Sequence, residues 1–354
     1  MSMVAGQQRV AVFTSTPAPY RDQLFRELGK LVGSLRIYYV SPTEDDRPWK
    51  TTDQAPSRRL KTLASLGRFG GLQPGVFRAV RRSDVVIVGG YHQFTYVLAL
   101  LLGRLLRKRV VLFFDGIAPS RFSRGGFLLQ FKRVVVSLPH VSLANGAVGQ
   151  LYFTERLKVP PAQVRNQYLV PVQFGTKFDK LQRSKLPKYD VLFVGRLIPR
   201  KGADVLIDAL RELPDLRLAI VGSGPLKAEL ETRAEGLNVE FLGELVQQEV
   251  AALMADARCL VAPSHDEPWG LVVQEAMQSD LPVVVTSDVG CAADLVMSGG
   301  NGIIAETRDR TSLARAIQAC IKLSSEDVHR CNDTILNEWT LSNHVRSFSE
   351  SCLK

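Results

Sequence analysis

The sequence contains few cysteines, and none of them is spaced as a metal ligand. Its 354 residues include five cysteines, an odd number, all in the C-terminal half, and no two of them form a CxxC pair. A disulfide framework and a zinc site of the CxxC type are therefore excluded. We expect free thiols in a reducing compartment.

No uninterrupted apolar stretch reaches the roughly 20 residues that a membrane-spanning helix needs. The longest, residues 91–114, is broken by Arg104 and by the basic run 107–109. It predicts a buried helix over 95–106, followed by a core strand over 110–114. The first apolar run, 10–13, is too short for a secretory leader. The chain is therefore expected to be soluble and cytoplasmic.

Acidic residues are scarce in the first half of the chain. Residues 1–187 hold 29 Lys and Arg against 10 Asp and Glu, whereas the remaining residues hold 16 against 25. A basic half of this kind indicates an anionic partner, either a membrane surface or nucleic acid. A solvated basic face without a partner is the alternative. Because no nucleic-acid-binding motif is recognisable, nucleic acid is not expected as the partner.

The glycine fingerprint of dinucleotide-binding enzymes is also missing. No GxGxxG follows the first predicted strand of either half, which argues against an enzyme that uses NAD or FAD. Short apolar strands nevertheless alternate with amphipathic helices, a pattern typical of parallel sheets. We therefore predict an α/β protein with two Rossmann-like domains. The predicted strands are 10–14, 35–39, 85–88, 110–114 and 141–144 in the first domain, and 191–194, 216–221, 239–242, 259–262 and 283–285 in the second.

A polar, basic, proline-containing segment over 176–188 predicts an interdomain linker. It separates a first domain of residues 1–175 from a second of residues 189–330, and residues 331–354 predict a closing helix. Ligands of such sheets bind beyond the carboxyl ends of the strands. Site residues are therefore expected in the loops that follow the strands.

Two such loops in the second domain indicate an anion-binding site. In GRLIPRKG, Gly195 permits a tight turn, and Arg196 and Lys201 place two cations before a helix, an arrangement that suits phosphate. In GSGP, Gly222 and Gly224 allow a ligand to approach the backbone closely, although a tight turn alone needs the same residues.

The stretch between Glu267 and Glu275 is the most informative. A predicted strand ends before it, and a helix starts near Gly270. The free amides of Gly270, Leu271 and Val272 can hold a phosphate. Glu275, about one turn further on, can accept hydrogen bonds from vicinal hydroxyls such as those of a ribose, and Glu267 can meet a sugar hydroxyl beyond the phosphates.

The stretch resembles the E-x7-E motif of retaining GT-B glycosyltransferases. With GRLIPRKG and GSGP it resembles glycosyltransferase family 4, including members that build bacterial surface polysaccharides, and the similarity covers nearly all of 190–325. The resemblance implies two Rossmann-like domains facing across a cleft, with the last helix, including Trp339, crossing back onto the first domain. It also implies a hexosyl donor linked to UDP or GDP.

The resemblance implies a role for each matching residue. Arg196 and Lys201 would bind the donor diphosphate, Glu267 the transferred sugar, the amides of 270–272 the distal phosphate, and Glu275 the ribose. Leu242 and Gly243 would lie beside the base. The family is retaining and is described as metal-independent. No Asp-x-Asp occurs in the chain, in agreement with a site that needs no metal or other cofactor.

The first domain matches the family less specifically. The loop 15–21 resembles the first loop of some members, which assigns Tyr20 and Arg21 to the acceptor side, although its prolines could serve only to shape a turn. Asp115 is our candidate for a residue near the reacting sugar. His92 is the second, with a structural role as its alternative. Tyr91 and Asn145 also follow strands and are predicted to line the acceptor side.

The acceptor must be inferred from the basic half. Basic and apolar residues interleave over 58–82, which suits an anionic bilayer. We therefore expect a peripheral enzyme on the inner face of the cytoplasmic membrane that extends a lipid-linked glycan in surface polysaccharide or lipopolysaccharide biosynthesis. A non-catalytic nucleotide-sugar-binding subunit is the alternative. Gln274, where relatives are apolar, is expected to face solvent.

Overall fold

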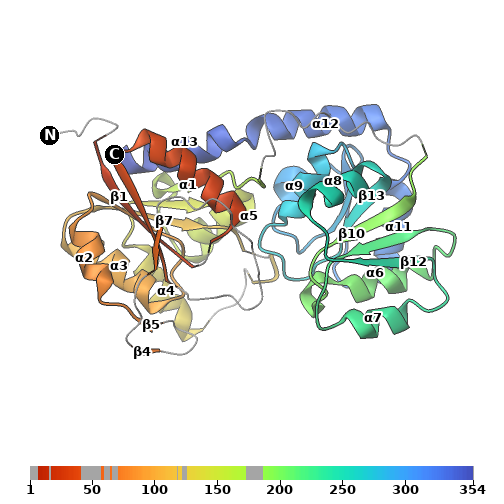
Figure 1. The fold of residues 1–354 in the computed structure, drawn as a ribbon, viewed down its shortest axis with the longest axis horizontal. Helices are drawn as coiled ribbons and strands as arrows, with labels where there is room; N and C mark the ends of the chain where they lie inside the picture. The colour runs from red at the N-terminus through yellow and green to blue at the C-terminus, as the bar shows by residue number, and fades with distance from the viewer. Residues whose placement is uncertain are drawn as a thin grey trace. The chain divides into compact units, whose positions relative to one another are not determined.

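Two compact units make up the protein in the computed structural model (Figure 1). The structure describes residues 7–15, 17–40, 57–59, 64–65, 71–117, 119–121, 126–172 and 186–353. Unit 1 consists of Met1–Asp115, Arg124–Val172 and Thr340–Lys354, and unit 2 of Gly116–Ser123 and Gln173–Trp339. Most of the predicted linker, together with Thr16, Lys61 and Arg68 of the motifs above, lies outside the described residues.

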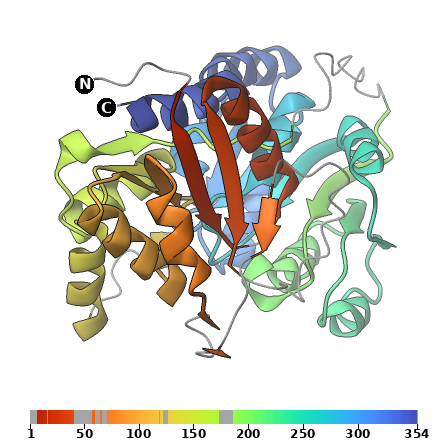
Figure 2. The same ribbon diagram turned by 60° about the vertical axis from the view of Figure 1, so that its left-hand side comes forward.

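Unit 1 is built on a seven-stranded sheet whose neighbouring strands are all parallel. Its order, β3-β2-β1-β6-β7-β8-β9, extends first to one side of β1 and then to the other, as in Rossmann-like sheets. Figure 2 shows β1 and β2 side by side, with β3 beyond them. The strands are β1 (Arg9–Thr14), β2 (Ser34–Tyr39), β3 (Ser57–Arg59), β6 (Val85–Val88), β7 (Arg109–Phe114), β8 (Val141–Ala144) and β9 (Val164–Asn166), and a separate antiparallel pair joins β4 (Ala64–Ser65) to β5 (Gly71–Leu72).

Helices cover both faces of this sheet. On one face α1 (Pro19–Leu31) and α13 (Leu341–Leu353) pack on alternate residues of the strands. On the other lie α2 (Gly75–Arg81), α3 (Phe94–Leu105) and α4 (Phe127–Val136). The chain continues after β8 through α5 (Gly146–Leu151) and a π-helical turn, η3 (Tyr152–Arg156). Central strands such as β6, all of whose residues are buried, are apolar throughout because both faces are covered.

Unit 2 repeats the same plan with a six-stranded parallel sheet of order β12-β11-β10-β13-β14-β15. Its strands are β10 (Tyr189–Val194), β11 (Leu218–Val221), β12 (Val239–Gly243), β13 (Ala257–Ala262), β14 (Val283–Thr286) and β15 (Gly302–Ala305). Its helices are α6 (Ala203–Leu210), α7 (Lys227–Arg233), α8 (Gln247–Ala255), α9 (Leu271–Gln278), α10 (Ala292–Leu295), α11 (Arg310–Cys320) and α12 (Ser325–Glu338). The α/β fold with two Rossmann-like sheets is therefore as predicted.

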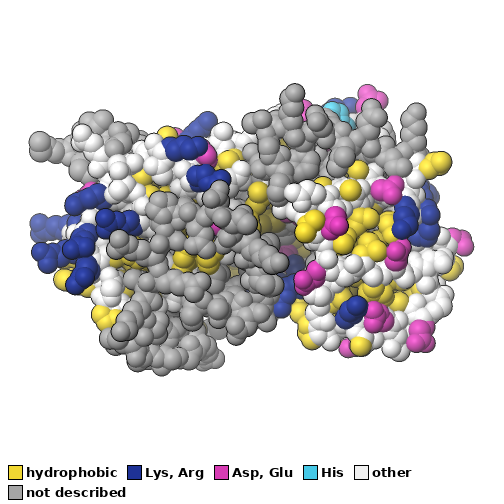
Figure 3. All heavy atoms as spheres, viewed as in Figure 1, with side chains coloured by type: hydrophobic (Ala, Val, Ile, Leu, Met, Phe, Trp, Pro, Cys, Tyr) yellow, Lys and Arg dark blue, Asp and Glu magenta, His cyan; other side chains and the backbone are white. Residues whose placement is uncertain are grey.

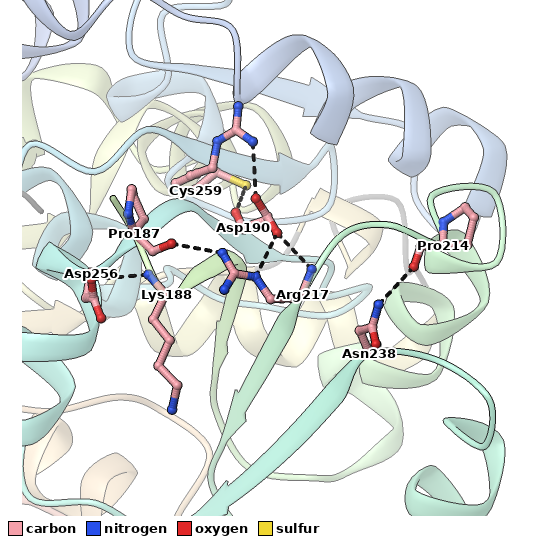
Figure 4. Close-up of polar contacts among 9 residues, drawn as sticks. Pro187, Lys188, Asp190, Pro214, Arg217, Asn238, Asp256 and Cys259 are labelled. Carbon is pink, nitrogen blue, oxygen red and sulfur yellow. Dashed lines mark hydrogen bonds and ion pairs between the residues drawn. The ribbon is translucent and has the colours of Figure 1, made fainter. Parts of the chain in front are cut away.

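A polar cluster fixes the amino-terminal ends of the strands in unit 2 (Figure 4). The Asp190 carboxylate accepts a hydrogen bond from the Arg217 backbone amide at 2.9 Å and one from the Arg258 guanidinium at 3.1 Å. The Cys259 thiol donates to the Asp190 carbonyl at 3.5 Å. Because Asp190 is the second residue of β10, these bonds join the start of β10 to the starts of β11 and β13, at the end of the sheet opposite the loops predicted to carry the site.

The C-terminal segment is two helices where the sequence predicted one over 331–354. α12 belongs to unit 2 and α13 to unit 1, and the division falls between Trp339 and Thr340. Trp339 leaves helical geometry, with ψ at 71°, and its ring lies 4.8 Å from that of Trp269. The burial of this large side chain explains why α12 ends at Glu338.

The predicted buried helix, α3, is buried along one side only. Tyr96, Ala99 and Leu100 are fully buried, whereas Leu101 and Leu105 are exposed. The sequence pattern could not show this because the helix is apolar around its whole circumference. In the part of the chain that the structure describes, no helix is long and apolar enough to cross a membrane. All five cysteines are buried free thiols, as expected.

Candidate functional site

The strand order of unit 2 identifies the loops in which a ligand site is expected. β10 and β13 are neighbours, and the chain winds in opposite directions from them, which makes their carboxyl ends the switch point of the sheet. The loop after β10 runs over 195–202, and the loop after β13 runs over 263–270. These are the two loops in which the sequence analysis predicted the phosphate-binding cations, Arg196 and Lys201, and the sugar-binding Glu267.

A charged pair joins these loops. Lys201, at the end of the short helix η5 (Pro199–Lys201), donates a hydrogen bond from Nζ to Oε2 of Glu267, and the Arg200 guanidinium lies 3.6 Å from the same oxygen. Both partners of the pair are largely buried. Lys201 has three N–H donors, so it can hold Glu267 and still donate to a phosphate oxygen. The sequence predicted separate roles for these residues and missed their contact.

Backbone contacts hold the two loops in register. His265 donates from its backbone amide to the Arg200 carbonyl at 3.0 Å, and Arg200 donates from its guanidinium to the Asp266 carbonyl at 3.1 Å. Gly202 has φ of 70°, and a Cβ there would lie 2.2 Å from the Pro263 carbonyl oxygen. Only glycine fits this position, because both the left-handed conformation and the close approach exclude a side chain.

Gly222 and Gly224 face neighbouring loops of the same unit. A Cβ at Gly222 would lie 2.0 Å from the carbonyl oxygen of Gly195, and one at Gly224 would lie 2.4 Å from that of Leu197. Gly222 also donates to the Gly243 carbonyl at 2.7 Å, which links this turn to the end of β12, next to Leu242. These glycines pack the turns after β10, β11 and β12 together, which is a structural reason for their presence.

The start of α9 offers backbone donors. Gly270, its N-cap, has φ of 102° and no side chain caps the helix. The amides of the following Leu271 and Val272 have no partner within the helix, as in the first turn of any helix. Arg196, which follows Gly195 in the loop after β10, is partly exposed. The uncapped helix start and the Lys201–Glu267 pair thus stand at the same switch point.

Glu275 lies one turn into α9. It borders a small cavity whose other lining residues come mainly from α8, among them Gln247 and Met254. Burial raises the pKa of its carboxyl group to about 7. Within the described residues no side chain or amide donates to it. A carboxylate kept in such surroundings destabilises the fold, a feature typical of functional sites.

Gln274 was expected to face solvent, and this expectation is wrong. Its side chain is fully buried and accepts a hydrogen bond from the Trp269 indole at 2.9 Å. A buried indole N–H requires an acceptor. The buried amide of Gln274 therefore serves Trp269, two residues after Glu267.

In unit 1, four side chains meet at the carboxyl ends of the strands. Asp115, directly after β7, accepts hydrogen bonds from the Arg21 guanidinium, from Tyr20 Oη at 3.2 Å and from Gln167 Nε2 at 3.0 Å. Burial by itself would raise the pKa of Asp115, but the charge of Arg21 and these hydrogen bonds hold it below its ordinary value. Asp115 is therefore an ionised acceptor.

This cluster contains buried polar atoms without partners among the described residues. They include Nε of Arg21 and Oε1 of Gln167, whose neighbouring nitrogens are bonded to Asp115. Each of these atoms has the capacity for one further hydrogen bond, Nε as a donor and Oε1 as an acceptor. His344 of α13 is also buried, which lowers its pKa to about 4, so it is neutral at physiological pH. The sequence indicated neither Gln167 nor His344, because both lie far from the motifs.

The remaining candidates of unit 1 are placed as follows. His92 is exposed and packs edge-on against Tyr96 at 5.3 Å, and Tyr91 stacks on Phe114 at 5.6 Å. Asn145 is buried and accepts from the Leu169 amide at 2.9 Å. Asn145 thus holds the chain after β9, and its Nδ2 donates to the Asp115 carbonyl at 3.4 Å. Of the residues predicted in unit 1, the structure therefore brings Tyr20, Arg21, Asp115 and Asn145 together.

Residues 176–335, which include both loops of the switch point, match the family model described as "Glycosyl transferases group 1". Over these residues, called the glycosyltransferase domain below after the family that they match, the chain is similar to group 1 glycosyltransferases. The Lys201–Glu267 pair, the start of α9 and Glu275 all belong to it. The glycosyltransferase domain begins in the predicted linker and ends within α12, so the cluster around Asp115 lies outside it.

Curated relatives of the chain are glycosyltransferases by name. The D-rhamnosyltransferase WbpZ of Pseudomonas aeruginosa is 32% identical over 221 residues, which cover 60% of this chain and 55% of WbpZ. A GDP-mannose-dependent alpha-(1-6)-phosphatidylinositol dimannoside mannosyltransferase of Mycobacterium tuberculosis is 34% identical over 142 residues, 39% of this chain and 36% of the relative. The chain thus spans less than two thirds of either relative.

Among solved structures, Anabaena HepE in complex with UDP superimposes with a TM-score of 0.74 at 20% identity, and the match covers 97% of this chain and 99% of HepE. The similarity extends beyond the glycosyltransferase domain to almost the whole chain. It confirms the predicted GT-B fold with two α/β domains.

Proposed function

We propose that the protein is a retaining hexosyltransferase. It would transfer a hexosyl group from a nucleoside diphosphate sugar to a lipid-linked glycan acceptor, in surface polysaccharide or lipopolysaccharide biosynthesis. The observation that carries the proposal is the Lys201–Glu267 pair at the switch point, next to the uncapped start of α9. A cation and free amides at one edge suit a diphosphate, and a carboxylate suits the hydroxyls of a sugar.

The donor would lie along the carboxyl ends of the strands in unit 2. Arg196 and Lys201 would bind the diphosphate, and the amides of Gly270, Leu271 and Val272 the distal phosphate. Glu275 would accept hydrogen bonds from the ribose hydroxyls, which would offset the cost of its burial, and Leu242 and Gly243 would lie beside the base. HepE is described with UDP and the mycobacterial relative is named for GDP-mannose, so the proposed donors carry UDP or GDP.

The proposed reaction needs no metal or other cofactor. The bond between the anomeric carbon and the diphosphate oxygen breaks, and a bond to the acceptor oxygen forms on the same face of the sugar. The acceptor proton passes to the departing phosphate oxygen. Lys201, Arg196 and the α9 amides stabilise the negative charge that develops on the diphosphate. Glu267, held in place by Lys201, orients the transferred sugar.

The acceptor would be bound by unit 1. Arg21, Tyr20 and Gln167 surround the ionised Asp115, and a set of charged and polar side chains at the carboxyl ends of the strands suits sugar hydroxyls. Tyr91, His92 and Asn145 remain candidates for the same side. The mycobacterial relative carries phosphatidylinositol dimannoside in its name, which supports a lipid-linked acceptor. The protein would act as a peripheral enzyme at the cytoplasmic face of the membrane.

Calorimetry with a panel of UDP-, GDP-, ADP- and TDP-sugars tests the donor. We expect one nucleotide to bind with at least tenfold preference and its sugar to be turned over by the purified protein. Binding without turnover, with hydrolysis or transfer absent for every acceptor tried, would favour a non-catalytic nucleotide-sugar-binding subunit. No binding of any nucleotide would contradict the donor site itself.

A further inference from the structure

One helical layer of unit 1 carries no acidic residue. The helices α2, α3 and α4 pack on the same face of the seven-stranded sheet, where Val76, Leu100 and Val135 belong to one buried cluster. Their sequences contain no Asp or Glu. Their charged residues are all basic: Arg78, Arg81, Arg104, Lys132 and Arg133. Glu155 is the next acid after Asp115, and the outer surface of the layer thus has charge of one sign.

The same layer exposes most of the large apolar side chains found on the surface. Seven of the thirteen large hydrophobic side chains exposed among the described residues lie on these three helices. Leu105, at 76% exposure, and Val134, at 65%, are the most open of the seven. The others are Phe77, Phe94, Leu101, Leu128 and Phe131. Scattered exposed apolar residues need no explanation, but a concentration on one layer marks an interaction site.

On α3 the exposed apolar residues form a continuous stripe. Phe94, Leu101 and Leu105, with the partly exposed Leu98, are spaced by three or four residues and therefore share one side of the helix. The buried residues Tyr96, Ala99, Leu100 and Gly103 occupy the opposite side. An ordinary surface helix carries polar residues where this stripe lies. The stripe runs along the whole of α3, from its first residue, Phe94, to its last, Leu105.

Basic residues gather at the C-terminal ends of α2 and α3. Lys108, just after α3, donates from Nζ to the Arg81 carbonyl at 3.3 Å, so the ends of α2 and α3 meet there. Beside α2 lies a cavity of about 280 Å³, lined by Arg9, Arg36 and Arg82 among others. Figure 3 shows Lys and Arg side chains gathered over α2 and the neighbouring strand ends. The Arg9 guanidinium is paired with Asp84, so Arg36 and Arg82 are the cations with which this cavity can accept the phosphate of a headgroup.

We propose that the outer face of α2, α3 and α4 docks on an anionic phospholipid bilayer. Leu101, Leu105 and Phe131 enter the interface, and the arginines beside α2 contact headgroup phosphates. α3 has 12 residues, a length of about 18 Å, so it lies in the interface plane and does not span the bilayer. The inference deepens the proposed function by giving it a membrane-binding surface, but the binding requires no catalysis.

A bilayer fits this face better than nucleic acid does. Leu101, Leu105 and Val134 are aliphatic and gain nothing from a phosphate backbone, and they cannot stack on bases as aromatic residues do. At a membrane interface the same side chains leave water, while Lys and Arg meet anionic headgroups. Four of the seven exposed apolar residues are aliphatic, and three helices that combine apolar and basic residues without acids are complementary to a charged bilayer.

Sedimentation with vesicles tests the proposal on the full chain. We expect the protein to co-sediment with phosphatidylcholine vesicles that contain about 30% phosphatidylglycerol, to bind pure phosphatidylcholine weakly, and to be released by salt. Arg78→Glu, Arg81→Glu and Lys132→Glu together should weaken binding at least 100-fold, because each basic residue near an anionic surface contributes roughly fivefold. Leu101→Ser, Leu105→Ser and Phe131→Ser together should weaken it at least about tenfold.

Matched variants elsewhere on the surface serve as controls. Lys227→Glu, Arg315→Glu and Lys322→Glu change the net charge by the same amount in unit 2, and Leu31→Ser, Leu151→Ser and Val246→Ser remove equally exposed apolar groups. Both control sets should bind vesicles as the unchanged protein does. Circular dichroism before each assay verifies that every variant is folded.

Three results would overturn the proposal. They are failure of the folded protein to bind anionic vesicles, equal binding by the α2–α4 variants and the controls, and tighter binding of RNA than of vesicles with the same dependence on these residues. Transfer to a water-soluble acceptor, measured without vesicles, reports on the proposed function separately. Loss of vesicle binding with that transfer intact would leave the transferase assignment in place.

Discussion

Lys201 and Glu267 form an ion pair that joins the loop after β10 to the loop after β13. They are 66 residues apart in the chain, and each follows one of the two central strands of the unit 2 sheet. The pair has a direct consequence for the proposed chemistry. The same ammonium that would meet the diphosphate also fixes the carboxylate that would hold the sugar, so the two ends of the donor site depend on each other.

We expect Glu267→Gln to lower kcat by two to three orders of magnitude, because the amide cannot replace the charge that orients the sugar. Lys201→Met should weaken donor binding as well as kcat. Since the two residues touch, the double variant should lose less than the sum of the single losses. Steady-state kinetics of the three variants test this. Strict additivity would show that the pair does not act as a unit.

Glu275 should make stability depend on pH. Its pKa is raised in the folded protein from the ordinary 4.5 to about 7. Because the folded state favours the neutral acid, this group's contribution to stability is present below about pH 4.5 and is lost as the pH rises to about 7. Glu275→Gln should therefore raise the free energy of unfolding at pH 8 by up to about 3 kcal/mol. Urea unfolding at pH 5 and pH 8 measures the difference.

The same substitution should weaken binding of the nucleoside diphosphate, because a neutral amide is a poorer acceptor for the ribose hydroxyls than a carboxylate. Nucleotide affinity of the unchanged protein should rise between pH 6 and pH 8, as Glu275 ionises. A variant that is more stable but binds the nucleotide less tightly would separate function from folding. Unchanged affinity in Glu275→Gln would contradict the ribose assignment.

We expect Asp115→Asn to lower kcat/KM for the acceptor about 10- to 100-fold, since Arg21 would lose its ionic partner and move from its place. Gln167→Ala should have a smaller effect in the same direction. Donor affinity should not change, because the proposed donor site lies in unit 2. Asp84→Asn, which breaks the exposed pair with Arg9, is the control. Weakened donor binding in Asp115→Asn would argue against an acceptor-side role.

Asp190→Ala should destabilise the protein without changing catalysis. The side chain is 11% exposed and accepts hydrogen bonds from the Arg217 amide and the Arg258 guanidinium. Removal of this acceptor should cost about 1–3 kcal/mol. Asp208→Asn, at an ion pair that is more exposed, should cost less than about 1 kcal/mol. Chemical denaturation measures both, and kcat should stay within twofold of the unchanged protein.

Apolar runs predicted the elements of the fold well where their boundaries are sharp. The strands over 85–88 and 141–144 have the predicted bounds, because turn residues flank them on both sides. The strands β3, β4, β5, β9 and β15 were missed, and the last two show why. β9 at an edge is only partly buried, and β15 begins with glycine, so neither carries the long β-branched run that marks a central strand.

Gln167 and Gln274 show what the sequence could not indicate. Each is a polar side chain whose role depends on one distant or buried partner, Asp115 for the first and the Trp269 indole for the second. Periodicity places a residue on a helix or strand face, but it does not say which side chain of another element meets it there. Similarly, it could not say that one side of α3 would be left uncovered.

The sequence by itself determined the alternation of strands and helices, the division into a basic and an acidic half, and the order of the motifs that mark the glycosyltransferase domain. These are local properties, because the period of the apolar residues and the chemistry of a turn are written within a few residues. Tertiary structure decided which charges pair, which polar atoms are buried without a partner, and which apolar faces remain exposed. Those properties depend on elements that are far apart in the chain, and only the folded sheet order brings Lys201 to Glu267 and Arg21 to Asp115.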